Sequence, residues 1–494
     1  MTPEQLDPEV QSFLGKTISG NERIDILPIT EYPPTFIEIL DQIKSISGNW
    51  NPVEIFTAES DSINGEKQKF ISAFLNGEQH TPSFTYSTAE KVAEKMKDEQ
   101  SRDKLVQLKK QVFDYFPKNR SERLMRIGVY SKIKDDLATI DMTEGIVNGD
   151  DELTAQAMRR KYGGVNEELI EHAINIYNES FEDPGKKVLI EPLLSPEEQE
   201  FLKNQQFNAE ELKMLFEWSL AELGILKTDS ESEGFQVIIS NETTDIDVRD
   251  KSSQGPTIFI PTVRGVEGET VDGEKALGLI EHEIRGHARQ SMNGYKQFLI
   301  GGGQLKFDNE TLYEGLAKRY DEEFIKQFFG KETGKPIPYY TFAVADAELG
   351  KSFYDIFSRQ FNLRLHTELK HPLDQPLPKR DQIDEGIFQK SLHNAWRTTY
   401  RVLRGHTDMS NPHAFAMAKD LSYLRGWLMD NQLKETGYGY INEIAIIPPG
   451  GLSMIAEFNI PDIEVPYPDK PLARLYWQKV LKPRMVTSSN KKNI

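Results

Sequence analysis

Two of the nine histidines in the chain lie five residues apart, and an acidic residue directly follows the first of them. His282, Glu283 and His287 form a His-Glu-x-x-x-His pattern in the segment GLIEHEIRGHARQ at 278–290. Imidazole nitrogens are common zinc ligands in proteins. The pattern therefore predicts a zinc site held in part by the two histidines. The alternative is a pair of core histidines that only form hydrogen bonds.

The spacing of the two histidines is one residue longer than in the common helical pair. Positions i and i+4 lie about 40° apart around an α-helix, whereas i and i+5 lie about 140° apart. A local i+5 bulge would bring the two rings back together, and Gly286 would tolerate the backbone distortion. We therefore expect a deformed helix that is capped by Asp272 and stops at Asn293-Gly294.

A catalytic zinc needs a third protein ligand, which is often a carboxylate from a later helix. Glu314 is the best candidate, because it opens a segment in which Tyr320, Phe324 and Phe328 recur at helical spacing. Gly301–Gly303 lies between the two helices. No Gly-Lys-Ser/Thr follows these glycines, so we expect a linker and not a phosphate loop.

Four motifs together resemble a known family, over roughly residues 35–465. They are similar to bacterial proteins labelled by a QEGLA motif, whose animal relatives are the microtubule-associated tyrosine carboxypeptidases. The four motifs are HEIRGH at 282–287, YEGLA at 313–317, RVLRGHTD at 401–408 and AKDLSYLRG at 418–426.

The resemblance implies that His282, His287 and Glu314 bind zinc and that Glu283 activates the attacking water. It also implies a zinc metallocarboxypeptidase, which hydrolyses the C-terminal bond of a peptide or protein and releases tyrosine or another aromatic residue.

Two residues depart from the family pattern. Tyr313 replaces the Gln of the family label, and His406 stands where no histidine is expected. These departures leave open a catalytically silent regulatory protein of the same family. A dipeptidyl peptidase III-like exopeptidase is the other alternative, because that family also has five-residue spacing with Gly before the second His. Acidic residues around the cleft would favour it, whereas Arg or Lys there would favour a carboxypeptidase.

A carboxypeptidase must bind the α-carboxylate of its substrate, and Arg does so with a bidentate fork. An oxyanion intermediate needs a further hydrogen-bond donor. A structural ion pair with Asp408 or Asp420 is the alternative role for the arginines. The candidate substrate-binding residues are Arg401, Arg404, Arg425, Tyr423 and His406.

Three β-rich runs precede the metal helix, at Phe235–Ile239, Asp245–Val248 and Thr257–Pro261. An edge strand beside such a helix can pair with an extended peptide substrate. Thr257–Pro261 fits this role, and Pro261 would end the pairing. An ordinary buried strand is the alternative.

Composition narrows the class of protein. The chain has no cysteine, so zinc would be held by histidine and carboxylate, as in catalytic sites. Its net charge of −19 argues against a nucleic-acid partner. It has neither an apolar run that could span a membrane nor a signal-like N-terminus, so we expect no membrane partner and a cytoplasmic location.

The expected fold is α+β and mostly helical, with a helical N-terminal region and a zincin-like metallopeptidase domain whose small β-sheet lies beside the metal helix. Capping boxes are expected at Ser87, Ser195 and Asn208, the first opening one long helix to Pro117. Further helices are expected at 344–361 and 388–402. The expected divisions are an N-terminal arm (1–34), a helical domain (35–230), a catalytic domain (231–465) and a C-terminal helix with a polar tail (466–494).

Overall fold

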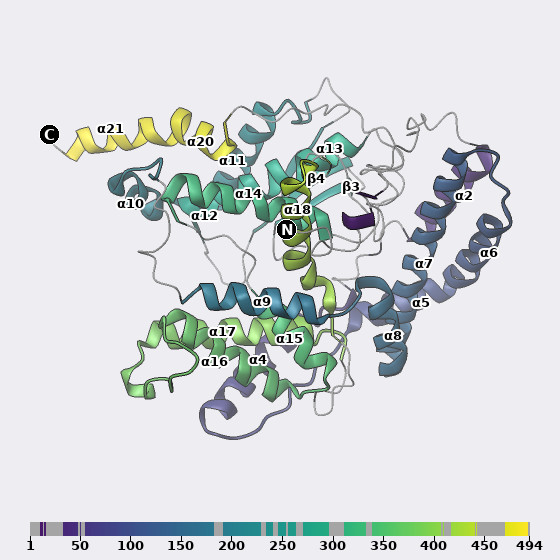
Figure 1. The fold of residues 1–494 in the computed structure, drawn as a ribbon, viewed down its shortest axis with the longest axis horizontal. Coiled ribbons are helices and arrows are strands. Elements are labelled where there is room, and N and C mark those ends of the chain that lie inside the picture. Colours follow the sequence, from purple (N-terminus) through teal and green to yellow (C-terminus); the bar gives the residue numbers. More distant parts are fainter. Residues whose placement is uncertain are drawn as a thin grey trace. The chain divides into compact units, whose positions relative to one another are not determined.

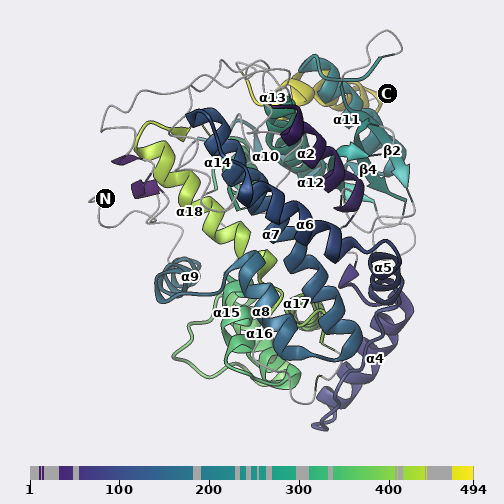
Figure 2. The same ribbon diagram turned by 90° about the vertical axis from the view of Figure 1, so that its right-hand side faces the viewer.

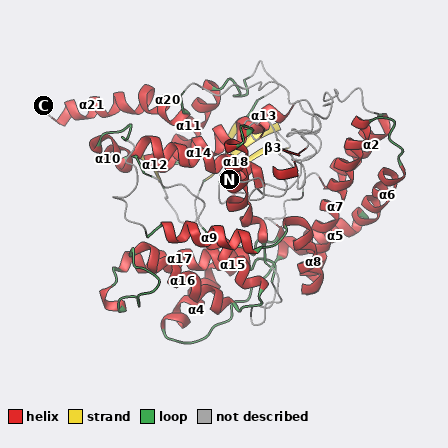
Figure 3. Cartoon of the chain, in the orientation of Figure 1, coloured by secondary structure: helices red, strands yellow, loops and turns green. Residues whose placement is uncertain are grey.

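The structure of the chain is a computed structural model, and the part of the chain that it describes is mostly helical (Figure 3). The strands among the described residues are short and form two small sheets. A mostly helical protein with a small β component is therefore confirmed. No helix in the described ranges is both long and apolar enough to cross a membrane. The described residues are 10–12, 14–15, 33–47, 50, 55–181, 191–228, 234–240, 246–252, 255–262, 270–295, 311–331, 338–406, 409, 416–439, 441 and 470–492.

Contacts divide the chain into two compact units, each assembled from separate stretches of sequence. The expected linear division at residue 230 differs from this one, because helices after residue 337 pack with helices of the N-terminal half. Most of the expected N-terminal arm, Gly301–Gly303 and Asp408 lie outside the described residues. The first unit comprises 1–31, 187–336 and 426–494, and the second comprises 32–186 and 337–425.

The first unit contains the predicted metal helix, in which α12 runs directly into η4 and α13 (Figure 1). Buried side chains such as Phe216, Phe324 and Trp477 form its hydrophobic core. Helix α18 (Leu421–Glu435) begins in the second unit and continues into the first. The other helices of the first unit are α10 (Pro196–Asn204), α11 (Ala209–Glu222), α12 (Gly273–Leu279), η4 (Ile280–Ala288), α13 (Arg289–Tyr295), α14 (Thr311–Phe329), α20 (Leu472–Tyr476), η8 (Trp477–Leu481) and α21 (Lys482–Lys492).

Local signals set the starts of three helices in this unit. Capping boxes at Ser195 and Asn208 open α10 and α11, and the Asp272 side chain caps α12, all as predicted. The predicted stop at Asn293-Gly294 agrees to within one residue with the end of α13 at Tyr295. The expected polar tail is partly wrong, because α21 extends to Lys492.

All three predicted strands are present and form one sheet, although the second, expected at Asp245–Val248, lies at Asp247–Ser252. Strand β4 (Gly255–Pro261) lies between β2 (Gln236–Ser240), to which it is parallel, and β3 (Asp247–Ser252), to which it is antiparallel. The expectation that Thr257–Pro261 is an open edge strand is wrong, because both of its edges are paired. Strand β3 is the edge strand that packs on η4. A second sheet joins β1 (Gln206–Phe207) to β5 (Val271–Asp272).

The second unit is built from helices. An aromatic cluster that includes Phe70, Phe357 and Trp396 fills the contact between α4, α16 and α17. Helices α6 and α7 form an antiparallel hairpin and lie side by side in both views (Figure 2). The helices are α2 (Pro34–Ser47), α4 (Ser60–Leu75), α5 (Ser87–Asp98), α6 (Ser101–Asp114), α7 (Arg120–Asn148), α8 (Asp151–Tyr162), α9 (Glu167–Glu179), α15 (Tyr339–Glu348), α16 (Phe353–Glu368) and α17 (Glu385–Val402).

Two expected helices of this unit are each broken in two. The helix expected to reach Pro117 is split at Gln100, whose φ of 52° is left-handed. Its expected capping box is absent because Ser87 is already helical and Tyr86 occupies the N-cap position. The helix expected at 344–361 is interrupted at Gly350, whose φ is 73°. The expected helix at 388–402 is confirmed as α17.

Candidate metal centre

The helix that carries both histidines is deformed in the predicted way. Residues Ile280–Ala288 form a π-helix, whose i→i+5 hydrogen bonds widen the turn. His282 and His287 therefore lie on one side, with ring centroids 4.9 Å apart. The helix thus has the i+5 bulge that the spacing of the two histidines predicted.

Gly286 serves this site by its small size. Its φ is not left-handed, so backbone freedom of the kind that we expected is not what the position requires. A Cβ atom on Gly286 would lie 3.1 Å from both Cα and Cβ of Ala317 on α14. The absence of a side chain lets η4 approach α14 closely, and α14 also carries Glu314. Ala317 of the YEGLA motif thus has a packing role against HEIRGH.

We predict that Gly286→Ala destabilises the protein by about 1–3 kcal/mol, because the added methyl group overpacks the contact with Ala317. Gly278→Ala, on the same helical run, is the matched control. Its Cβ would meet Phe324 at an ordinary 3.6 Å, so no loss is expected. Denaturant unfolding of both variants measures the difference, and equal stabilities would contradict this role for Gly286.

Glu314 completes a group of three side chains that could hold a metal ion. Its Oε2 atom lies 3.7 Å from His282 Nε2 and 3.8 Å from His287 Nε2. The three ligand atoms all lie within 4.8 Å of one another. Ligand atoms around a tetrahedral zinc are separated by about 3.3 Å, so small side-chain movements would close the shell. Two imidazoles and a carboxylate suit Zn²⁺ and similar divalent ions.

Asp321 lies behind His282 and was not identified from the sequence. Its Oδ2 atom is 3.1 Å from His282 Nδ1 and 2.6 Å from Lys318 Nζ. A carboxylate in this place fixes the orientation of a ligating imidazole and raises its basicity. Asp321 is seven residues after Glu314, or two helical turns, so both carboxylates lie on one face of α14. That i+7 spacing was the available signal.

These contacts shift the pKa values of both partners. Burial alone would raise the pKa of Asp321, but His282 and Lys318 lower it to about 2. Burial alone would lower the pKa of His282, but Asp321 and Glu283 raise it to about 9. A cation that binds His282 must therefore displace a proton.

Glu283 lies next to His282, a candidate metal ligand, in an environment that disfavours the charge of its carboxylate. Burial is the largest cause that raises its pKa to about 8, and the carboxylates of Glu314 and Asp321 add to it, while His282 acts in the opposite direction. A divalent cation in the three-residue group would lower this pKa. Glu283 is thus a carboxyl group that can both accept and return a proton near neutral pH.

Tyr313, the residue that departs from the family label, contacts the site directly. Its ring stacks on the His287 imidazole, with centroids 3.8 Å apart and an interplanar angle of 24°. An aromatic ring in this position restricts rotation of the imidazole. The departure therefore supports the orientation of a candidate ligand.

A buried polar network attaches the metal helix to the C-terminal helices. Glu281 is fully buried and accepts hydrogen bonds at 2.7 Å from Arg285 Nη1 and from the backbone N–H of Ala473 in α20. The Arg285 guanidinium also lies 3.9 Å from the centre of the Tyr320 ring. Glu281 thus caps α20 while holding η4, which couples the position of the metal helix to the C-terminal segment.

The five candidate substrate-binding residues belong to other parts of the fold. Arg401 forms two hydrogen bonds with Asp420, at 2.5 and 3.2 Å, and Arg404 Nε donates to the carbonyl of Arg401. The ion pair with Asp420 that we considered for Arg401 is thus present. Tyr423 and Arg425 lie in the first turns of α18. Arg401, Arg404, His406, Tyr423 and Arg425 are all in the second unit, whereas His282, His287 and Glu314 are in the first.

His406, the second departure from the family pattern, is fully buried. Its carbonyl accepts a hydrogen bond from the Tyr86 hydroxyl, which in turn accepts one from the N–H of Gly405. The segment after α17 is therefore held against the start of α5 through Tyr86. This contact gives the His406 region a structural role within the second unit.

No family model, curated protein or solved structure matches the chain. The geometry of the first unit's metal-binding group therefore carries the functional conclusion.

Proposed function

We propose that the chain is a zinc-dependent metallopeptidase of the carboxypeptidase type, with a zincin-like catalytic region. The observation that carries this proposal is the convergence of His282, His287 and Glu314, in which the π-helical turn of η4 brings the two histidines to one side of the helix. Such distortions occur preferentially at functional sites. The family resemblance supplies the substrate class, which is the C-terminus of a peptide or protein with a terminal aromatic residue.

The residues around the metal group have distinct roles in this proposal. A bound zinc ion would supply Lewis-acid polarisation of the scissile carbonyl and lower the pKa of water. Glu283 takes the proton from the attacking water and returns it to the leaving amine. Asp321 fixes the tautomer of His282 by accepting from Nδ1–H, and Tyr313 restricts rotation of His287.

The sheet offers a place for the substrate backbone. Strand β3 packs on η4, and among the described strands it has a neighbour on one side only, β4. Its Asp247 is close enough to contribute to the raised pKa of Glu283. An extended peptide that pairs with the other edge of β3 would run beside the metal helix.

A test of the proposal compares peptides that end in free tyrosine, tyrosine amide and free alanine. We expect release of tyrosine from the first and no cleavage of the amide, because an α-carboxylate that leaves water needs a paired cation. Single alanine variants of Arg401, Arg404 and Arg425 test each candidate in turn, and a loss of about 2–3 kcal/mol in kcat/KM would mark the residue as that cation. Arg397→Ala, on the exposed side of α17, is the matched control.

Other outcomes of this digestion select the alternatives. Dipeptides released from the N-terminus would replace the carboxypeptidase proposal with a dipeptidyl peptidase. Stoichiometric zinc without cleavage of any peptide in a library would indicate a silent regulatory protein.

A further inference from the structure

The hairpin of α6 and α7 exposes large apolar side chains to solvent. The exposed fractions are 50% for Val106, 69% for Phe113, 90% for Phe116 and 42% for Ile127. Single exposed apolar residues are normal on protein surfaces. Here four lie within residues 106–127 of one helical hairpin, and they include both phenylalanines that are exposed among the described residues. This grouping indicates a contact surface.

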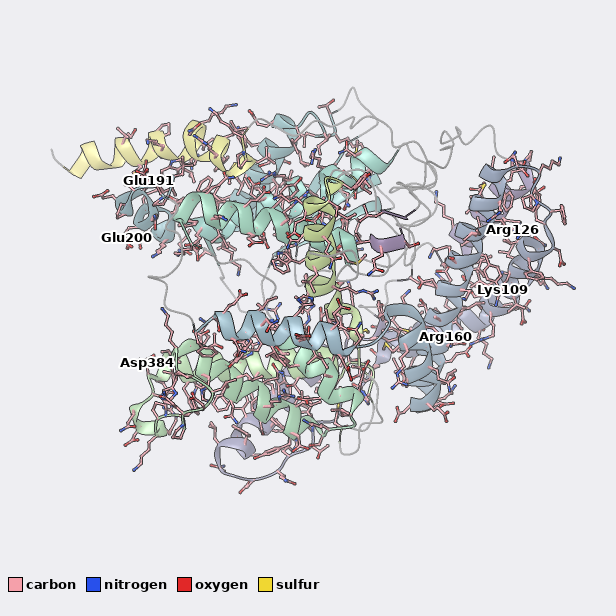
Figure 4. All side chains as sticks on the ribbon, viewed as in Figure 1. Lys109, Arg126, Arg160, Glu191, Glu200 and Asp384 are labelled. Atoms are coloured by element: carbon pink, nitrogen blue, oxygen red, sulfur yellow. The ribbon has the colours of Figure 1, made fainter. Side chains whose placement is uncertain are left out.

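The part of the hairpin that contains α6 and the start of α7 is basic, although the chain is acidic. Residues 101–127 contain eight Lys and Arg against three Asp and Glu, a local net charge of +5 in a chain of −19. The exposed basic side chains of this segment are Lys104, Lys110, Lys118 and Arg123. Figure 4 labels two further basic residues of the hairpin, Lys109 on α6 and Arg126 on α7.

Helical spacing interleaves the apolar and basic side chains. Val106, Lys110 and Phe113 occupy positions i, i+4 and i+7 of α6 and therefore share one face. Arg123 and Ile127 are related in the same way on α7. Each helix thus presents an exposed apolar side chain beside a lysine or arginine. This arrangement suits a partner that has an apolar interior and a negatively charged surface.

The loop between the two helices presents Phe116 from a fixed backbone. The Glu122 carboxylate accepts hydrogen bonds from the Tyr115 hydroxyl and from the N–H of Lys118, both at 2.8 Å. Arg126 Nη1 donates to the Tyr115 carbonyl at 3.0 Å. The loop is thus held on both sides of Phe116 while the ring itself is almost fully exposed. Little backbone entropy therefore remains to be lost when that ring is buried by a partner.

We propose that this surface of α6 and α7 binds peripherally to an anionic phospholipid bilayer. The exposed phenylalanines would enter the headgroup region, and the exposed basic side chains would contact lipid phosphates and carboxylates. A deformable interface fits a ring that projects from a loop better than a protein partner does, since that partner would need a preformed pocket. At physiological ionic strength, charges more than about 8 Å from the bilayer are largely screened. The basic side chains of this surface therefore affect binding more than the net negative charge of the whole chain does.

This binding differs from spanning a membrane. The absence of a long apolar run argues only against a membrane-spanning segment, and the net charge of −19 is a property of the whole chain. Neither quantity describes a local surface. The proposal is also independent of the metal site, because all of its residues lie in the second unit.

The apolar part of the proposal is tested by co-sedimentation of the full chain with phosphatidylcholine vesicles that do or do not contain phosphatidylserine. We expect binding only to the anionic vesicles, and at least a tenfold loss, an order-of-magnitude figure, in Phe113→Ser/Phe116→Ser. Both side chains are exposed, so the variant should keep its unfolding temperature. Leu349→Ser/Leu373→Ser, which removes two exposed leucines elsewhere in this unit, is the matched control.

The charge part uses a second pair of variants. Replacing three exposed lysines of the hairpin by glutamine should weaken binding by about fivefold for each charge removed. Added salt should also weaken the binding of the wild-type chain. Replacing three exposed lysines of α5 should have little effect. The hairpin variant changes Lys104, Lys110 and Lys118, and the control variant changes Lys91, Lys95 and Lys97.

Three results would overturn the proposal. The first is equal binding to neutral and anionic vesicles, or no binding to either. The second is binding to poly-glutamate but not to vesicles, which would assign the surface to an acidic protein. The third is a dimer in solution that Phe116→Ser dissociates, which would make this surface an interface between two copies of the chain.

Discussion

The double variant His282→Ala/His287→Ala should hold no zinc after dialysis, whereas the wild-type chain should hold about one equivalent. Two of the three converging ligands are then lost, and Glu314 alone cannot retain the ion. Elemental analysis of the dialysed proteins measures the result. Wild-type zinc content in the double variant would show that the ion binds elsewhere.

Single changes around the site should give graded losses of zinc affinity. Glu314→Gln removes a ligand, and Asp321→Asn removes the hydrogen-bond acceptor of His282, for which a loss of about 10- to 100-fold is expected. Glu322→Gln is the control on the same helix, because Glu322 bonds Trp427 and is outside the site. Since Asp321 and Glu283 raise the pKa of His282 to about 9, zinc affinity should increase with pH up to that value.

The metal group could be predicted from the sequence because its chemistry is local. Two histidines at i and i+5 cannot both face one ion from a regular helix, so a shared ion required the bulge that the π-helix provides. Glu314 followed from the need for a third ligand and from the helical pattern after it. The capping boxes of α10 and α11 were equally local, since each depends on residues three positions apart.

The features that were missed depend on distant contacts. Thr257–Pro261 has the pattern of a strand, but its central position depends on pairing with β2 and β3, which period-2 alternation does not specify. The close approach of Gly286 to Ala317 joins segments about thirty residues apart. The break at Gln100 places a non-glycine residue in a left-handed conformation, for which the charged helical pattern gave no sign.

Glu283→Gln should keep zinc and the fold but lose hydrolysis by about 10²- to 10⁴-fold. The amide has nearly the same shape as the carboxylate but cannot accept the proton of the attacking water. Glu283 is not one of the three converging ligands, so the zinc content should stay at the wild-type value. Peptide cleavage and elemental analysis on the same sample separate these two effects. Glu274→Gln on α12 is the matched control, since it removes a carboxylate from the same helical run outside the site.

The stability of the zinc-free variant provides an independent check on the environment of Glu283. Burial and neighbouring carboxylates raise its pKa from 4.5 to about 8, so ionisation of Glu283 lowers the stability of the zinc-free wild type as pH rises through this range. Glutamine cannot ionise, and Glu283→Gln should therefore be the more stable of the two zinc-free proteins at high pH, with the difference shrinking toward pH 4.5. Thermal unfolding of both zinc-free proteins across this pH range measures the difference in stability. A variant that kept half of the wild-type cleavage rate would exclude Glu283 as the general base, whatever its effect on stability.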